Sequence, residues 1–433
     1  MAKKMHEIRD PLHVFIRLDS DERKVLNSRP FQRLRYIHQL GLTYLLYPGA
    51  THRRFEHSLG VMELAGRVYD TITEPSNIYH DSVRNVVPAH DSYEHTYWRR
   101  VLRMAALCHD VGHLPFSHSA QDLLPDGWDH ERLTLEIIRS DELESIWKEI
   151  KIQSDDVAKL AVGPKKYKDS GFTDWEAILS EIIIGDAFGV DRMDYLLRDS
   201  HHVGVSYGKF DHYRLIDTIR ILPKDEYGSA EPALGIEEGG LHSAEALLLA
   251  RYFMYTQLYC HPVRRIYDIH LRDFLKKCLP AGYLPIEIEE HLQLTDNEIL
   301  VDLLKSAREE KHQGYDPSRR ITNREHFRLL YQRNPNDTSK NLEAGKLIFN
   351  AACEKFGEAN VRYDTYKQKS SGLNFPVLSI DGRIMSSLAM SEALKTVPIV
   401  AVDYVFINPD YRKEAEKWLK EKREAIITKK EEE

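Results

Sequence analysis

The sequence predicts a mainly α-helical protein with a small α+β lobe towards its C-terminal end. Between about residues 20 and 275 the apolar residues recur mostly at helical spacing, whereas short apolar runs and turn signals indicate strands after about residue 313. A chain of 433 residues can bury a full core and carry an appendage. We therefore expect a helical core over residues 1–312 and an α+β lobe over residues 313–433, which ends in a charged helix.

The predicted core helices are recognised by apolar residues that share one face. Val61, Leu64, Ala65 and Val68 follow the spacing i, i+3, i+4, i+7 of a buried helical stripe. Comparable stripes occur in residues 102–108, 178–183 and 247–259. A histidine, His57, precedes the first of these stripes, and another, His109, directly follows the second.

Two segments interrupt the helical pattern of the core. Residues 73–100 are polar and contain two prolines, which predicts a connecting loop between helices. The short segment Leu234–Ile236 is bounded by proline and glycine residues, which predicts a strand or hairpin inserted among the helices.

The C-terminal lobe carries the strand signals. Asp381-Gly382 separates two short apolar runs within residues 377–385, a pattern typical of a hairpin with a two-residue turn. Another strand is predicted over residues 399–407. Helical patterns near residues 345–356 and 387–394 complete the lobe. Residues 411–433 are dense in Lys and Glu and predict a solvated helix that frays at its end.

Charge and cysteine content argue against several classes of function. The chain has 60 Lys and Arg against 68 Asp and Glu, a net charge of −8, which disfavours an obligate partnership with nucleic acid or an anionic membrane. Its four cysteines lack C-x-x-C spacing, so neither a disulfide framework nor a zinc knuckle is predicted. No apolar run approaches the roughly 18 residues of a spanning helix, and the start of the chain lacks the apolar core of a signal peptide. We therefore expect a cytoplasmic protein with no membrane partner.

The segment from residue 107 to residue 118 concentrates histidines at the end of an apolar helix. His109 and His113 are four residues apart and would share one face of a continuing helix, while Asp110 can reach a common cation. The proline that follows should end the helix and let His118 fold back over the same site. Imidazole and carboxylate without thiolate suit iron, manganese or another borderline-to-hard cation. The segment therefore predicts a catalytic metal site with open positions for water.

Two further metal ligands, His57 and Asp191, are predicted at the edges of other apolar segments. Each of these residues alone could equally be a hydrogen-bonded buried histidine or a capping aspartate, but burying all four polar groups without a cation would be costly. A metal with open positions acidifies water and polarises phosphorus, which predicts a hydrolase. The pairs His80-Asp81 and His90-Asp91, in contrast, lie in the polar loop and are expected to make solvent or loop contacts.

Cationic and aromatic residues near these positions fit a phosphorylated substrate. Arg54, Arg192 and Arg251 could clamp a polyphosphate beside the metal. Tyr255 and Tyr259, at i and i+4, could form the wall of a base pocket or belong to the ordinary core.

Four ordered motifs resemble those of the HD-superfamily deoxynucleoside triphosphate triphosphohydrolases. The motifs are Phe31–Gly41, Pro48–Gly60, His109–His118 and Asp191–Asp199, within a resemblance that extends from about Ile8 to His270. The resemblance implies an HD-domain helical phosphohydrolase core. It also implies cleavage between the 5′ oxygen and the α-phosphorus of a dNTP, which gives a deoxynucleoside and inorganic triphosphate.

The resemblance also implies roles for individual residues. It assigns metal ligation to His57, His109, Asp110 and Asp191, which would hold one divalent transition metal such as iron or manganese, with Mg²⁺ on the substrate phosphates. His118 would protonate the departing 5′ oxygen, which is a poor leaving group as an alkoxide. The residues implied around the phosphates are His113, His130 with Glu131 to orient it, Arg54, Arg192 and Arg251.

Further matched positions surround the sugar and the base. Gln39 and Asp199 would hold the 3′ hydroxyl, and Leu40 and Tyr195 would pack against the sugar, which favours deoxyribose over ribose. In the base pocket this chain has Tyr255 and Cys260 at positions that vary in the family, so base preference does not transfer.

Two departures from the family pattern concern catalysis and regulation. Gln121 stands where relatives carry an acidic residue that assists the histidine at position 118, and the adjacent Asp122 would point about 100° away on a helix. Asn27 stands where a regulated relative carries an acidic residue that recognises guanine in an activating site. Gln32 and Arg35 of that site are retained, so an allosteric nucleotide site is conceivable but recognition of GTP is not expected.

The resemblance leaves three aspects of function open. The alternatives to a dNTP hydrolase are another HD phosphohydrolase, acting on monophosphates, cyclic or oligonucleotide signals or single-stranded ends, and a nucleotide-sensing regulator. Relatives form tetramers or hexamers, so a homo-oligomer is expected by analogy. Control of nucleotide pools and antiviral depletion of dNTPs both fit the family.

Overall fold

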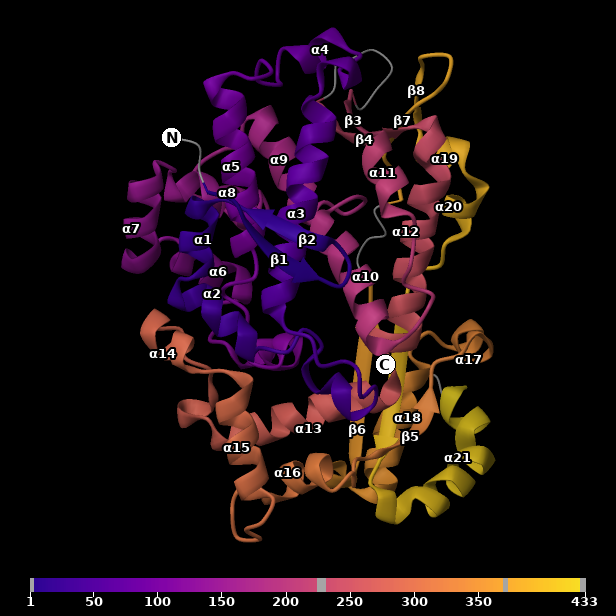
Figure 1. Cartoon of the computed structure of the whole chain (residues 1–433). Helices are drawn as coiled ribbons and strands as arrows, with labels where there is room; N and C mark the ends of the chain where they lie inside the picture. Colours follow the sequence, from indigo (N-terminus) through magenta and orange to yellow (C-terminus); the bar gives the residue numbers. More distant parts are fainter. Residues whose placement is uncertain (1–3, 224–230, 369–372, 429–433) are drawn as a thin grey trace. The chain divides into compact units, whose positions relative to one another are not determined.

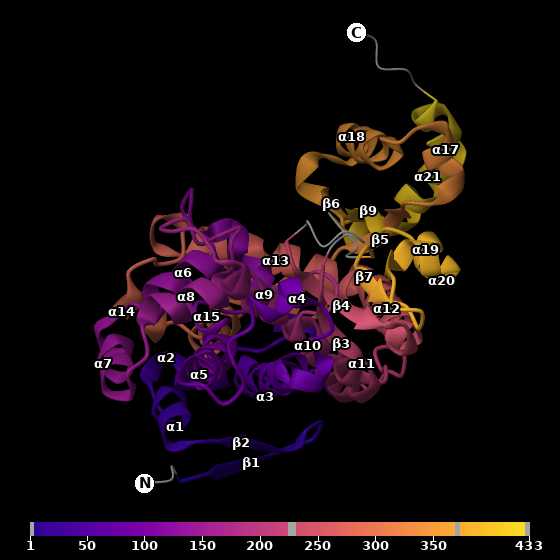
Figure 2. The same ribbon diagram turned by 90° about the horizontal axis from the view of Figure 1, so that it is seen from above.

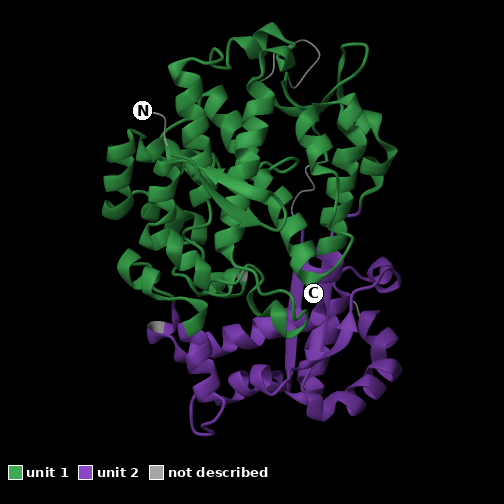
Figure 3. Cartoon of the chain, viewed as in Figure 1, with its two compact units in different colours: residues 1–254, 284–297, 370–397 green, residues 255–283, 298–369, 398–433 purple. Residues whose placement is uncertain are grey.

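The predicted mainly α-helical fold is confirmed by a computed structural model, which describes residues 4–223, 231–368 and 373–428 (Figure 1). The chain divides into two units that interleave in sequence (Figure 3). The first unit comprises Met1–Met254, Leu284–Asn297 and Ser370–Val397. The second comprises Tyr255–Tyr283, Glu298–Lys369 and Pro398–Glu433. This division differs from the predicted single boundary between residues 312 and 313.

The first unit is built mainly from helices. Its longer helices are α3 (Arg54–Thr73), α5 (Tyr93–Cys108), α6 (His130–Ile138), α7 (Asp141–Ile150), α8 (Ser154–Val162), α9 (Asp174–Ile184), α10 (Val190–Val203) and α12 (Leu241–Met254). Shorter helices are α1 (Ser20–Leu26), α2 (Arg29–Arg33), α4 (Asp81–Arg84), α11 (His212–Thr218), α14 (Ile288–Gln293), α19 (Ser387–Met390) and α20 (Glu392–Thr396). The predicted helix at residues 387–394 is thus two short helices.

Helix α3 lies at the centre of this unit and packs against α5 and α10. The predicted stripe at residues 61–68 is buried, as are Tyr69 and Ile72 on the next turn. The helix starts after Arg53, whose backbone N–H donates to the Glu56 carboxylate at 2.7 Å. The sequence thus placed the central helix correctly from its apolar period.

The connection between α3 and α5 is shorter than predicted. The expected loop over residues 73–100 is limited to residues 74–92 and contains α4, because α5 already starts at Tyr93. The hydroxyl of Ser92 accepts a hydrogen bond from His95 N at 3.0 Å and caps the first turn of α5. The first turns of α5 are polar, so the apolar pattern in the sequence did not indicate that the helix begins at Tyr93.

Two small sheets belong to the first unit. Strands β1 (His6–Asp10) and β2 (Val14–Leu18) form an antiparallel hairpin that lies beside α3 (Figure 2). The other sheet has the order β3-β4-β7-β8, with β3 (Ile219–Leu222), β4 (Ala233–Glu237), β7 (Pro376–Leu378) and β8 (Ile384–Ser386). The strand predicted at residues 234–236 is β4.

The predicted hairpin at residues 377–385 exists but belongs to the first unit. Strand β7 pairs parallel with β4, with Ile236 opposite Val377, so this hairpin extends the sheet of the helical core. The turn is also longer than the expected two residues, because β7 ends at Leu378 and β8 begins at Ile384. Gly382 adopts a φ of 83°, which accounts for glycine at this position.

The second unit contains a three-stranded antiparallel sheet covered by helices on both faces. Its order is β5-β9-β6, with β5 (Arg328–Gln332), β9 (Ala401–Ile407) and β6 (Val361–Lys367). Alternate residues of β9 face opposite sides. Val405 and Ile407 pack with α18 (Ala344–Phe356) and α21 (Arg412–Ile427), whereas Tyr404 and Phe406 pack with α13 (Pro262–Cys278). The remaining helices of this part are α15 (Asp296–Ser306), α16 (Tyr315–Thr322) and α17 (Pro335–Lys340).

Gly112 allows α6 to approach the turn that follows α5. A Cβ atom added at Gly112 would lie 2.2 Å from Thr134 N and 2.5 Å from His130 O, both backbone atoms of α6. The Gly112 N–H also donates to Thr134 Oγ1 at 3.1 Å. A glycine is therefore required here for close packing, and this packing sets the position of His130.

We expect Gly112→Ala to lower the free energy of unfolding by about 1–3 kcal/mol, because the new methyl group overpacks a contact with helical backbone. Gly171→Ala is the matched control, since a Cβ atom at Gly171 would meet nothing within 4 Å. Urea denaturation of both variants measures the difference. Equal stability of the two variants would show that α6 does not depend on this close approach.

Candidate metal centre

Helix α3 carries His57 on its second turn and directs the ring into the interior of the first unit. The residue is 1% exposed. Its Nδ1 lies 2.9 Å from Asp194 Oδ2. Because a carboxylate can only accept, Nδ1 carries the hydrogen, and Nε2 is the atom that faces Asp191, at 3.1 Å from Oδ1. The ring is thus oriented with Nε2 towards the other predicted ligands.

His109 and Asp110 lie where α5 ends. The helix stops at Cys108 with His109 as its C-cap, so the prediction that His109 and His113 share one face of a continuing helix is wrong. The His109 Nδ1 donates to the carbonyl of Ala106 at 2.8 Å, and Nε2 faces Asp110 and Asp191. The turn instead presents His109 and Asp110 side by side.

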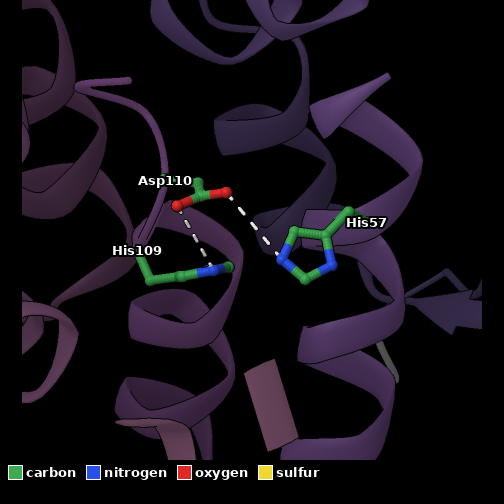
Figure 4. Close-up of side chains that lie close together, drawn as sticks. All are labelled: His57, His109 and Asp110. Atoms are coloured by element: carbon green, nitrogen blue, oxygen red, sulfur yellow. Dashed lines mark ion pairs between the residues drawn. The ribbon is translucent and has the colours of Figure 1, made fainter. Parts of the chain in front are cut away.

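Helix α10 supplies Asp191 on its first turn. Its Oδ1 lies 3.1 Å from His57 Nε2 and 3.6 Å from His109 Nε2. Asp110 completes the group, with Oδ1 3.6 Å from His109 Nε2 and Oδ2 3.8 Å from His57 Nε2 (Figure 4). Three segments that are far apart in sequence therefore bring the four predicted ligands together.

This donor set fits a divalent cation. The facing nitrogen and oxygen atoms are separated by 3.1 to 3.8 Å, and ligand atoms about 2.0–2.2 Å from one ion would themselves be about 3 Å apart. The buried Nε2 of His109 has no hydrogen-bond partner among the residues that the structure describes. Two imidazoles and two carboxylates without a thiolate suit iron, manganese or a similar ion.

The electrostatics of the group require compensating positive charge. Burial alone would lower the pKa of His57, but hydrogen bonds to Asp191 and Asp194 raise it to about 10. Burial would raise the pKa of Asp110, but the Arg54 guanidinium and the two imidazoles hold it below its usual range. The nearby His109 and His57 imidazoles lower the pKa of Asp191 against the effect of burial. In the metal-free protein, protons on the histidines thus balance the carboxylates.

Arg54 lies against the metal centre. Its guanidinium pairs with Asp110 Oδ2 and hydrogen-bonds Ser117 Oγ at 3.0 Å. Ser117 in turn donates to the carbonyl of His38 at 2.9 Å. Arg54 is 4% exposed, so a buried guanidinium lies beside the predicted ligands, and its role in phosphate binding stays a prediction.

His113 and His130 lie next to each other beyond the metal centre. Their ring centroids are 4.4 Å apart. Glu131 Oε2 is 3.3 Å from His130 Nδ1, but these two atoms do not form a hydrogen bond, so the orienting role of Glu131 stays a prediction. Burial and the neighbouring Asp129 raise the pKa of Glu131. These residues are therefore close enough to act on one substrate.

A cavity of about 1160 Å³ opens at the metal centre within the first unit. Its wall includes His109, Asp110, Asp191, His130 and Glu131. From there it continues along α8 and α9 to the β7–β8 hairpin. The Asp191 side chain is 34% exposed, which shows that the centre is open to this cavity.

Arg192 and Arg251 are the other two arginines that are predicted to bind phosphate. The Arg192 guanidinium hydrogen-bonds the carbonyl of Gly185 at 3.1 Å and also that of Asp186. It would have to release these carbonyls to reach a phosphate. Arg251 lies on α12 and is buried.

The predicted sugar-binding residues are buried or half-buried in the first unit. Two histidines, His52 and His202, lie next to one of them, Asp199. Gln39 and Leu40 are buried, and Tyr195 is half-buried on α10. Asp199 Oδ1 accepts a hydrogen bond from His52 Nε2 at 2.7 Å. His52 stacks on His202 with ring centroids 4.5 Å apart. His52 lies within the motif Pro48–Gly60 and His202 follows the motif Asp191–Asp199, but the sequence alone predicts no role for either histidine.

Tyr255 and Tyr259 belong to the second unit. They lie on a π-helical turn, Tyr255–Tyr259, that follows α12. The two rings meet edge to face at 5.0 Å, and Tyr255 also stacks on Tyr366 at 5.9 Å. The predicted i, i+4 contact of the tyrosines is present, although the helix there is not the expected α-helix.

The predicted allosteric residues lie together at the end of α1, on α2 and on the 3₁₀ helix η1 (Leu34–Tyr36), which carries Arg35. Asn27 is the exposed C-cap of α1. Gln32 Nε2 donates to the carbonyl of Leu26 at 2.7 Å, and Arg35 Nε donates to Gln32 Oε1 at 2.9 Å. Their role as a nucleotide site stays a prediction.

His118 lies in the 3₁₀ helix η4 (Ser117–Leu123), together with Gln121 and Asp122. The side chain of His118 is outside the described part of the structure. The general-acid role therefore stays a prediction. Because η4 is a 3₁₀ helix, the α-helical angle assumed between Gln121 and Asp122 does not apply.

The two His-Asp pairs of the polar loop lie outside the metal centre, as predicted. His80 caps α4 by accepting a hydrogen bond from Ser82 N at 3.2 Å. His90 and Asp91 form a pair whose side chains are 41% and 88% exposed. Such exposure distinguishes them from the buried His109-Asp110 pair.

Comparison with known proteins agrees with this geometry. The HD domain model matches residues 54–198, a span that contains all four predicted ligands, and the model of the HD associated region matches residues 210–355. The uncharacterized protein YwfO of Bacillus subtilis is 30% identical over 418 residues, which are 90% of this chain and 88% of that protein. The chain belongs to the HD-domain family.

Named relatives of this HD-domain protein include vertebrate enzymes. The deoxynucleoside triphosphate triphosphohydrolase SAMHD1 of Gallus gallus is 30% identical over 371 residues, covering 76% of this chain and 57% of that protein. The human protein of the same name is 28% identical over 369 residues, covering 76% and 56%. The chain thus spans little more than half the length of these relatives.

A solved structure supports the fold of the HD-domain protein over nearly its whole length. The crystal structure of a hypothetical protein from Aquifex aeolicus has a TM-score of 0.78 and 33% identity, and covers 96% of this chain and 100% of that chain. Among the helices of the described residues, none has the length and apolar character that crossing a membrane requires.

We expect His109→Ala and Asp191→Ala each to lose the bound metal while remaining folded, because each removes one of four ligands. Inductively coupled plasma mass spectrometry measures metal content, and circular dichroism checks folding. His90→Ala, which removes an exposed histidine, is the control and should keep its metal. Unchanged metal content in both ligand variants would contradict the assignment.

Metal binding should depend on pH. An incoming ion must displace the proton that His57 holds up to a pKa of about 10. The apparent affinity for Mn²⁺ should therefore rise about tenfold per pH unit between about pH 7 and pH 9. Calorimetric titration in buffers of different ionisation enthalpy measures both the affinity and the proton released. An affinity independent of pH would show that His57 does not give up a proton to the metal.

Proposed function

We propose that this HD-domain protein is a metal-dependent phosphohydrolase that converts a dNTP to a deoxynucleoside and inorganic triphosphate. The observation that carries the proposal is the meeting of His57, His109, Asp110 and Asp191 beside the buried guanidinium of Arg54. Membership of the HD-domain family supports phosphohydrolase activity, and the names of the SAMHD1 relatives support the dNTP substrate.

The four ligands would hold one divalent ion, iron, manganese or a similar metal. When bound, such an ion lowers the pKa of water and polarises a phosphate oxygen. Arg54 stands where it can bind a phosphate oxygen next to the ion, and its contact with Asp110 keeps that carboxylate ionised. A guanidinium in a buried site offsets the negative charge of a polyphosphate more strongly than one in water.

His113, His130 and Glu131 would act on the phosphate chain. The adjacent rings of the two histidines can donate hydrogen bonds to phosphate oxygens, and the Glu131 carboxylate would orient His130. His118 would donate a proton to the 5′ oxygen as its bond to phosphorus breaks. The water oxygen becomes part of the triphosphate product, and the proton that this water releases replaces the one that His118 gives to the 5′ oxygen, so atoms and charge balance.

The deoxyribose would be held by residues around Asp199. His52 binds Asp199 Oδ1 and so fixes the carboxylate, while the buried Gln39 Oε1 makes no hydrogen bond to another described residue. A 3′ hydroxyl could donate to these oxygens. Leu40 and Tyr195 would then pack against the sugar face. Discrimination against ribose follows if the 2′ hydroxyl finds no partner there.

A second candidate is a phosphodiesterase that acts on a cyclic dinucleotide or an oligonucleotide. The observation that favours it is the size of the cavity at the metal centre, about 1160 Å³. Ligand pockets are commonly about 300–1,000 Å³, so a substrate larger than one nucleotide would fit.

Incubation with each dNTP, each NTP and cyclic dinucleotides, in the presence of Mn²⁺ or Mg²⁺, distinguishes the two candidates. We expect ³¹P NMR and chromatography to show deoxynucleoside and triphosphate from dNTPs. The His109→Ala protein, purified in the same way, controls for contaminating phosphatases. Pyrophosphate and dNMP would refute the proposed bond cleavage, and turnover of cyclic dinucleotides alone would favour the phosphodiesterase.

For His118→Ala we expect metal content and dNTP binding to persist while turnover falls by a factor of about 100 or more, because a general acid contributes roughly that much. Single-turnover rates and equilibrium binding of a dNTP separate the two effects. The exposed His90→Ala is the control. Full activity of His118→Ala would remove this residue from the general-acid role.

A further inference from the structure

Asp194 is a fully buried carboxylate that contacts a predicted metal ligand without belonging to the metal centre. It lies on α10 and is 0% exposed. Its Oδ2 accepts from His57 Nδ1 at 2.9 Å and from Arg198 Nε at 2.8 Å. Its Oδ1 accepts from His13 Nε2 and from Arg198 Nη2, both at 2.9 Å. Both oxygens are thus held by two donors each.

The N-terminal hairpin β1–β2 contributes Asp10 and His13 to the hydrogen bonds around Asp194 and Arg198. Arg198, itself 0% exposed, donates from Nη1 to Asp10 Oδ2 at 2.9 Å. The other oxygen of Asp10 accepts from the backbone N–H groups of Leu12 and His13, both at 2.9 Å. The turn between β1 and β2 is thereby folded around Asp10, and this turn carries His13 to Asp194.

Val14 shows that this turn is held in a specific shape. Its φ is 63°, in the left-handed region that a β-branched residue rarely adopts. Such a conformation persists only where the surrounding contacts determine it. The neighbouring His13, which is 3% exposed and bound to Asp194, is one such contact.

Gly60 leaves the space that Asp194 and Arg198 occupy against α3. A Cβ atom at Gly60 would lie 1.9 Å from Asp194 Oδ1 and 2.5 Å from Arg198 Nη2. Gly60 is three residues after His57 on the same helix, so the carboxylate can reach the helix face beside the histidine ring. Any side chain at this position would displace the carboxylate.

We propose that Asp194 is a positioning residue that, held by Arg198 and the Asp10–His13 turn, fixes the His57 ring for metal binding. The N-terminal hairpin thereby determines how tightly the centre retains its ion. This inference rests on the metal centre of the proposed function. A carboxylate that accepts from Nδ1 fixes the tautomer whose Nε2 binds a metal, and the loss of such outer contacts typically weakens metal affinity by about 10–100-fold.

A purely structural role for Asp194 would have a different signature. The Asp194–Arg198 pair could serve only to connect α10 to the hairpin, and its loss would then lower stability without changing the ligands. A positioning role also changes metal affinity in proteins that remain folded. Metal affinity of folded variants is therefore the measurement that separates the two roles.

The test compares Mn²⁺ affinity in the full-length protein and four variants. Asp194→Asn removes one acceptor with little change of shape, Gly60→Ala displaces the carboxylate without removing a polar group, and His13→Ala removes the contact from the hairpin. Gly66→Ala is the matched control on α3, because its Cβ would meet the buried guanidinium of Arg103 at 2.7 Å and not Asp194. Calorimetric titration of metal-free protein measures affinity, and circular dichroism confirms folding.

We expect Asp194→Asn and Gly60→Ala to bind Mn²⁺ about 10–100-fold more weakly, with a smaller loss for His13→Ala and a change within about twofold for Gly66→Ala. If Asp194→Asn does not fold, Gly60→Ala and His13→Ala decide the question. Folded variants that bind Mn²⁺ as tightly as the wild type does would overturn the positioning role. This result would not affect the assignment of the metal ligands. Failure of the wild type to bind Mn²⁺ would overturn the metal centre, and this inference with it.

Discussion

The central constraint on the first unit is the gathering of two imidazoles and two carboxylates at one point, where His57, His109 and Asp110 are buried and the Asp191 side chain is 34% exposed. Ionised carboxylates removed from water are costly unless positive charge lies beside them. Arg54 supplies part of that charge for Asp110. In the metal-free protein the rest comes from protonated histidines, and His57 keeps its proton up to a pKa of about 10. A divalent cation would replace these protons with a charge centred between the ligands, which explains why so polar a cluster can occupy the interior of a helical core.

The surrounding helices are arranged to bring these groups together. Helix α3 presents His57, the end of α5 presents His109 and Asp110, and the first turn of α10 presents Asp191. Next to the turn after α5, the centre opens to a cavity of about 1160 Å³. His130 and Glu131 line the wall of this cavity near the centre. The same helices bury the polar network behind the centre. The side of the centre that holds the ligands in place is therefore closed, and the side that would receive a substrate is open.

Much of this arrangement could be predicted from sequence, because periodic apolar residues indicated the helices and the polar residues at their ends indicated which side chains meet. What could not be predicted depends on contacts between distant segments. The helix that carries His109 ends at Cys108 although the sequence pattern allowed it to continue, and the close approach of α6 at Gly112 accompanies that end. Asp194 lies within the motif Asp191–Asp199, but its contact with His57, 137 residues away in the sequence, has no local signal. The β7–β8 hairpin was predicted, but its pairing with β4 was not, because a parallel pairing leaves no local signal.

The most direct test of this account is the location of the metal itself. Crystals of the full-length protein loaded with Mn²⁺ should give one strong anomalous-scattering peak at the manganese absorption edge, within about 2.0–2.3 Å of His57 Nε2, His109 Nε2 and an oxygen of each of Asp110 and Asp191. A peak elsewhere, or these four side chains paired with one another in metal-loaded crystals with no peak between them, would contradict the central claim.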